Sequence, residues 1–165
     1  MNITVKNVKI ADFASEETLC FQATVYVDGK RAFIAHNDGH GGANYYYPLK
    51  GGNRDAIKSV GKHAATLPKI QTTLPATDGS DNCFSYQQDI DHLVNEAVEE
   101  FQIQKDIKRL LKKVAIYEDG EIYTFNIAGR DAPRVRNRIE ERHPTCIILN
   151  NEPLEEAVKL YKSAM

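Results

Sequence analysis

The chain has 165 residues, 42% of them hydrophobic, so its length suits one domain with a buried core. Its 21 basic and 23 acidic residues nearly balance, which excludes attraction of nucleic acid or membrane by the field of the whole molecule. No apolar run is long enough to span a bilayer, and the opening residues 1–6 alternate like a strand instead of forming a signal peptide. We therefore expect a cytoplasmic protein with no membrane partner.

The first third of the chain predicts three strands. Apolar alternation over residues 3–10 slips by one position, which indicates a strand with a bulge near Lys6 and Asn7. Clean alternation over 19–27 predicts a second strand, and Asp28-Gly29 predicts a hairpin turn after it. A turn of the two-residue type would pair Val25 with Ala32, Ala23 with Ile34, and Phe21 with His36.

The middle of the chain predicts two helices. Asn53 is a suitable cap for a helix that runs to about Thr66, and residues 69–82 have no period and predict a loop. Ser85 and Gln88 form a capping-box pattern before a strong helical stripe. This stripe is expected to be buried against sheet, and it consists of Ile90, Leu93, Val94, Ala97, Val98 and Phe101. The helix either continues or kinks near residues 102–104, where the phase slips.

The last third predicts a second hairpin, a helix, a short strand and a final helix. The turn at Asp119-Gly120 would pair Ile116 with Tyr123 and Val114 with Phe125. A helix capped by Asp131 precedes a buried strand over 145–149 that includes Cys146, and the final helix is expected to bury Leu154, Ala157, Val158 and Tyr161.

The resulting order of elements, β-β-β-α-α-β-β-α-β-α, predicts an α+β fold with an antiparallel sheet built from two hairpins and with four helices. We expect one domain over 1–165, with a subdivision into 1–113 and 114–165 as the alternative. The three cysteines Cys20, Cys83 and Cys146 lie far apart, without a Cys-x-x-Cys pair, and are interpreted as free thiols.

The stretch His36–Pro48 concentrates residue types that occur at functional sites. Three glycines lie within four positions, two histidines and an aspartate lie among them, and three tyrosines follow. We take this loop as the binding face, with the candidate residues Asp38, His40, Gly41, Gly42, Tyr45, Tyr46 and Tyr47. We expect His40 and at least one tyrosine to be exposed, while His36 packs near Phe21 and orients the loop.

Two chemical hypotheses compete for these residues, and a third concerns a separate surface. His36, Asp38 and His40 are metal-ligand types, but the favoured interpretation is an Asx-type turn at Asp38 with histidines that hydrogen-bond the loop, and therefore no cofactor. The successive N–H groups of residues 38–42 would also suit a small anionic ligand, with a tyrosine stacking on its ring, although no P-loop is present.

The third hypothesis is a basic surface. Its secondary patch comprises Arg134, Arg138 and Arg142, and a lysine-rich cluster covers residues 105–113. Pairing of Arg138 with Glu141 and of Arg136 with Glu140 favours a solvated surface instead, so nucleic acid ranks below a protein as the expected partner.

Three stretches are considered together: residues 15–30, the Asn37-Asp38-Gly39-His40-Gly41-Gly42 loop, and residues 143–161, with 106–109 and the 114–123 hairpin also fitting. They resemble a family of small uncharacterised proteins of bacteriophages and mobile elements. The resemblance covers most of the chain and carries no catalytic residues with it. It implies an accessory protein that binds a host protein or defence complex without turnover. The alternative is a metal-dependent hydrolase or nuclease, or a nucleotide-binding protein, that uses the same loop.

Overall fold

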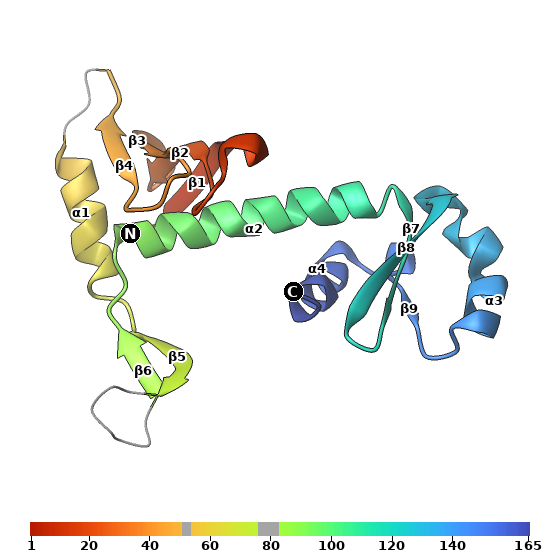
Figure 1. The fold of residues 1–165 in the computed structure, drawn as a ribbon. Helices are drawn as coiled ribbons and strands as arrows, with labels where there is room; N and C mark the ends of the chain where they lie inside the picture. The colour runs from red at the N-terminus through yellow and green to blue at the C-terminus, as the bar shows by residue number, and fades with distance from the viewer. Residues whose placement is uncertain (51–53, 76–82) are drawn as a thin grey trace. The chain divides into compact units, whose positions relative to one another are not determined.

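The computed structural model describes residues 1–50, 54–75 and 83–165, and it confirms an α+β fold (Figure 1). The described residues form four α-helices and three antiparallel sheets of four, two and three strands. The chain divides into two compact units, residues 1–99 and 100–165, which are described separately below. The single domain predicted from the sequence stays a prediction.

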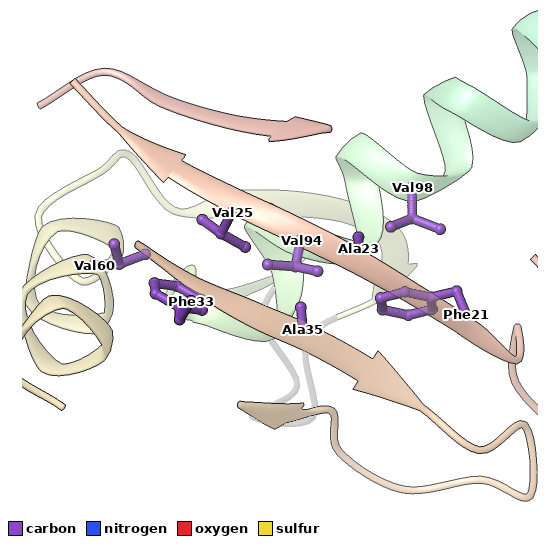
Figure 2. Packing of buried hydrophobic residues seen from close by; sticks show 8 residues of the cluster. All are labelled: Phe21, Ala23, Val25, Phe33, Ala35, Val60, Val94 and Val98. Atoms are coloured by element: carbon purple, nitrogen blue, oxygen red, sulfur yellow. The ribbon is translucent and has the colours of Figure 1, made fainter. Parts of the chain in front are cut away.

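The first unit is built on a four-stranded antiparallel sheet. Its strands β1 (Ile3–Ile10), β2 (Phe21–Val27), β3 (Lys30–Asn37) and β4 (Tyr45–Pro48) lie in the order β1-β2-β3-β4. Helix α1 (Asp55–Ala64) and the start of helix α2 (Ile90–Leu110) cover one face of this sheet. Figure 2 shows the core between them, made of Phe21, Ala23, Val25, Phe33, Ala35, Val60, Val94 and Val98.

A bulge in β3 sets which side chains of this strand face the core. Asp28 and Gly29 have φ values of 49° and 79°, so the two-residue turn is confirmed. The register then shifts between Val25 and Tyr26, and Phe21 lies opposite Asn37. The predicted partner His36 is therefore wrong, because one extra residue in β3 turns every later side chain to the other face.

The other predicted bulge is confirmed. The β1–β2 register shifts between Lys6 and Lys9, and Asn7 has a φ of 54°. A short 3-10 helix, η1 (Asp12–Ala14), follows β1.

A two-stranded sheet replaces part of the predicted 69–82 loop. Strand β5 (Ile70–Pro75) pairs with β6 (Cys83–Tyr86), so the loop prediction is wrong for β5, and the rest of it lies outside the described residues. Among residues 70–74 and 83–86 no side chain is buried, so these residues lack the alternation that burial on one face would produce. The predicted cap Asn53 also lies outside the described residues.

Helix α2 begins later than predicted and runs without a break from Ile90 to Leu110. Ser85 belongs to β6, and Asp89 Oδ1 accepts a hydrogen bond from His92 N at 2.8 Å, so the capping-box prediction is wrong. Val94 and Val98 are buried as expected, whereas Phe101 is 42% exposed. The predicted burial of Phe101 is wrong because Val98 is the last residue of the stripe that belongs to the first core.

The second unit contains a three-stranded sheet in the order β8-β7-β9, with β7 (Lys113–Glu118), β8 (Glu121–Ala128) and β9 (Ile147–Ile148). The predicted pairs of the second hairpin are confirmed. Alternate residues of β7 enter two cores, because Ala115 packs with α4 (Leu154–Ser163) and Ile116 packs with α3 (Ala132–Arg142). Two 3-10 helices, η2 (Gly129–Asp131) and η3 (Leu149–Asn151), connect these elements.

Two details of the second unit correct the prediction. Leu154 is 40% exposed at the first turn of α4, while Ala157 and Val158 carry the buried face. Cys146 lies before β9 and is half-buried, and all three cysteines are free thiols as expected.

Candidate functional site

The glycine loop starts at Asn37, which lies at the end of the core row and is 4% exposed. Its Oδ1 accepts hydrogen bonds from Gly39 N at 2.9 Å and from Thr18 Oγ1 at 2.7 Å. Its Nδ2 donates to Asn44 Oδ1 at 2.9 Å and to Gly42 O at 3.4 Å. The Asx-type turn therefore belongs to Asn37, not to Asp38 as predicted, because only the buried Asn37 points toward the loop backbone.

Gly39 ties this loop to the segment between β1 and β2. Its carbonyl oxygen accepts hydrogen bonds from the backbone N–H groups of Glu16, Glu17 and Thr18 at 3.0, 2.9 and 3.3 Å. Gly39 has a φ of 87°, and a Cβ built on it would lie 2.0 Å from the carbonyl oxygen of Ala14. Only glycine allows this approach, so the two segments form one connected structure.

A second set of polar contacts holds the far end of the loop. Asn44 is 8% exposed, and its Nδ2 donates to Asn95 Oδ1 at 2.8 Å. The Tyr46 hydroxyl donates a hydrogen bond to Asp91. Burial and then this hydrogen bond raise the pKa of Tyr46 well above its usual range. Tyr46 therefore holds the loop against α2, and its ring is less accessible than those of its neighbours.

The candidate metal ligands lie in two separate pairs. His36 Nε2 is 3.2 Å from Asp38 Oδ1, and His40 Nδ1 is 3.2 Å from Glu16 Oε2. His36 also lies on the face opposite Phe21, which corrects the predicted packing, since the bulge turns it outward. Among residues 1–50, 54–75 and 83–165, no three His, Cys, Asp or Glu side chains gather as a metal site.

The predicted anion-binding nest is partly occupied by the protein itself. Gly39 N donates to Asn37 Oδ1, and Gly41 N donates to Thr18 Oγ1 at 3.3 Å. These two N–H groups are central to the nest, so their internal bonds compete with any anion.

The predicted exposure of His40 and of at least one tyrosine of the loop is confirmed. The His40 side chain is 64% exposed, and Tyr45 and Tyr47 are each 53% exposed on the outward side of β4. Phe13 in η1 was not singled out from the sequence, yet it is 95% exposed. Its signal in the sequence was a lone aromatic residue within the polar 11–18 segment.

A pocket with a volume of about 290 Å³ opens beside the loop. Its apolar lining comes from Leu19, Phe21 and Val98, and two carboxylates, Glu17 and Glu99, also line it. No ion pair or hydrogen bond engages either carboxylate among the described residues. The remaining lining residues are Thr18, Asn37, Gly42 and Asn95.

The predicted arginine patch lies on α3. Arg134 and Arg138 line a hollow together with the carboxylates of Asp131 and Glu141, and Arg142 is exposed at the end of the helix. Arg136 Nε lies 2.6 Å from Glu140 Oε1, so this predicted pair is confirmed. The mixture of charges weakens the patch as a site for polyanions.

Comparisons with protein-family models, curated proteins and solved structures gave no match to this chain. Within the described part of the chain, no helix has both the length and the apolar character needed to cross a membrane.

Proposed function

We propose that this chain acts by binding a partner protein through a loop face, defined as Phe13, Glu16, Glu17, His40 and Gly41. The observation that carries the proposal is the exposed Phe13 phenyl ring on a segment bonded directly to the glycine loop. Aromatic side chains are frequent energetic anchors of protein interfaces. Because the backbone beneath this ring is already ordered, binding costs less conformational entropy than ordering a free loop would.

The pocket beside the loop suggests the chemistry of the partner. Glu17 and Glu99 supply negative charge next to an apolar lining. A lysine or arginine side chain combines an aliphatic stem with a cationic head, and it matches both features. We therefore expect a partner that offers a basic side chain beside an apolar site for Phe13.

The resemblance to phage and mobile-element proteins supports a host protein or defence complex as the partner. The alternative of a metal-dependent hydrolase or nuclease would need a ligand set, and His36, Asp38 and His40 lie in separate pairs. A nucleotide-binding role would need free loop N–H groups, two of which are already bonded. Binding without turnover therefore agrees best with the geometry.

The test is affinity capture from host lysate, followed by a titration with the purified captured protein. We expect Phe13→Ser to weaken this binary binding by at least tenfold, and Glu17→Gln to weaken it by a smaller factor that shrinks as salt rises. Tyr123→Ala is the control, because Tyr123 is 44% exposed on β8 and lies outside the loop face. A captured protein that binds Phe13→Ser and His40→Ala as tightly as wild type, with both variants folded, would refute the proposal.

A further inference from the structure

The four-stranded sheet has a second face, opposite the core, that the function proposed above does not use. Cross-strand partners share a side of a sheet, so the register identifies the side chains on this face. They are Thr4, Lys6 and Lys9 from β1, Gln22, Thr24 and Tyr26 from β2, Arg31, Ile34 and His36 from β3, and Tyr45 and Tyr47 from β4. We call this set the open face.

The charge of the open face differs from that of the whole chain. The chain has more acidic than basic residues, 23 against 21, yet the open face has three basic side chains and no carboxylate of its own. Lys6, Lys9 and Arg31 are all exposed. Asp38 lies at the margin of the face, against His36. The complementary partner of such a surface is an anion.

The same face carries aromatic rings beside these charges. Tyr45 and Tyr47 are each 53% exposed on neighbouring outward positions of β4. The Tyr45 ring centroid lies 6.3 Å from that of His36, and Lys6 Nζ lies 5.2 Å from the Tyr26 ring centroid. In proteins that bind single-stranded nucleic acid, aromatic rings stack on the bases and basic groups contact the phosphates.

From this combination we infer that the open face binds single-stranded nucleic acid. Outward positions two residues apart on a strand are separated by about 6.7 Å, which is about twice the rise per nucleotide of a duplex. Tyr45 and Tyr47 can therefore each stack on one base only where the nucleic acid is stretched and unpaired. The bases of a duplex stay stacked on each other and do not reach the two rings.

The width of the sheet sets the length of the ligand. The lysines on β1 and the tyrosines on β4 are separated by three strand spacings, or about 14 Å. A mononucleotide is too short to contact both edges, whereas an oligonucleotide of several residues spans them. Affinity should therefore rise steeply from a mononucleotide to a strand that covers the face.

The experiment is a fluorescence-anisotropy titration of the full chain with labelled 12-residue single strands of DNA and of RNA. The same sequence as a duplex and a mononucleotide as competitor complete the set. We expect a single strand of either kind to bind more tightly than the duplex, with no measurable competition by the mononucleotide. Tyr45→Ala and Tyr47→Ala should each weaken binding by about 5- to 150-fold.

Charge and fold provide the controls. Lys9→Gln should make the slope of log affinity against log salt shallower by about 0.7, because one phosphate contact is lost. Tyr123→Ala removes a tyrosine from β8 that is 44% exposed, against 53% for Tyr45 and Tyr47, and should bind like wild type. Phe13→Ser should also bind nucleic acid normally, which separates this inference from the proposed protein partner. Thermal melts would verify that each variant is folded.

Three results would overturn the inference. The first is no binding of single strands in 50 mM salt, and the second is equal binding of single strand and duplex. The third is binding that survives Tyr45→Ala and Tyr47→Ala but is lost in Arg134→Gln or Lys108→Gln, which would assign it to another basic surface.

Discussion

The contact between Gly39 and Ala14 leads to a prediction with an internal control. Gly39 and Gly42 have almost the same φ, 87° and 89°, so alanine at either position meets the same backbone strain of about 1–2 kcal/mol. A Cβ at Gly42 meets no atom within 4 Å, whereas a Cβ at Gly39 lies 2.0 Å from Ala14 O. Only Gly39→Ala must therefore push two backbone segments apart.

The extra cost of Gly39→Ala can be estimated from the bonds that this separation breaks. Three backbone N–H groups, from Glu16 to Thr18, donate to the Gly39 carbonyl oxygen. At about 0.5–1.5 kcal/mol each, their loss adds about 1.5–4.5 kcal/mol to the strain. Gly39→Ala should thus lower the free energy of unfolding by about 2.5–6.5 kcal/mol, and Gly42→Ala by about 1–2 kcal/mol.

Urea unfolding followed by circular dichroism measures the difference in stability, and amide hydrogen exchange measures its location. In Gly42→Ala, the amides of residues 16–18 should exchange as slowly as in wild type, whereas in Gly39→Ala they should exchange faster. Equal destabilisation by the two variants, or unchanged exchange at residues 16–18 in Gly39→Ala, would show that this contact does not organise the loop.

Three further predictions concern the same molecule. Asn37→Ala leaves two buried groups, Gly39 N and Asn44 Oδ1, without their hydrogen-bond partner, and should lower the free energy of unfolding in urea by about 2–6 kcal/mol. Its control is Asn126→Ala at an exposed position of β8, which should change this free energy by less than about 0.5 kcal/mol. Phe33→Ala empties a fully buried position and should cost about 3–5 kcal/mol, while Phe101→Ala, at a 42% exposed position, should cost less than about 1 kcal/mol; equal effects would contradict the assigned core. The hydrogen bond from Lys162 holds the pKa of Glu100 below its ordinary value, so this pair contributes stability above the unfolded-state pKa of about 4.3 and loses it as pH falls through the lower folded-state pKa. Lys162→Met should therefore be up to about 1 kcal/mol less stable than wild type at pH 7, and this difference should disappear in acid; a difference that persists at pH 2 would refute the electrostatic origin.

The parts of the fold that the sequence determined are those with local causes. Both Asp-Gly turns form as predicted, because two adjacent residues supply the positive φ values of a two-residue hairpin turn. The bulge in β1 was visible as a slip in alternation, and it occurs where that slip predicted. The glycine loop was also predicted from its local composition, and His40, Tyr45 and Tyr47 are exposed there as expected.

The bulge in β3 had no such local signal, and only the tertiary structure decided it. Residues 32–35 read Ala-Phe-Ile-Ala, so both faces of the strand are apolar and a one-residue shift leaves the pattern unchanged. Packing of Phe33 against Tyr46 and α1 selects one register, which buries Asn37 and turns the half-buried His36 to the opposite face of the sheet. Asn37, and not His36 as predicted, therefore orients the loop through its hydrogen bonds.

Local patterns also did not determine which side chains are exposed, because exposure depends on elements that are distant in the sequence. Phe101 continues the apolar stripe of α2, yet the core of the first unit ends at Val98, since a helix stripe records spacing and not the extent of the surface it meets. Phe13 lies in a largely polar stretch of sequence, and only the structure shows that its exposed ring is next to residues whose backbone N–H groups donate to Gly39. The grouping of basic and tyrosine side chains on the open face likewise depends on which strands are neighbours, because β1 and β4 are far apart in sequence and meet only through β2 and β3.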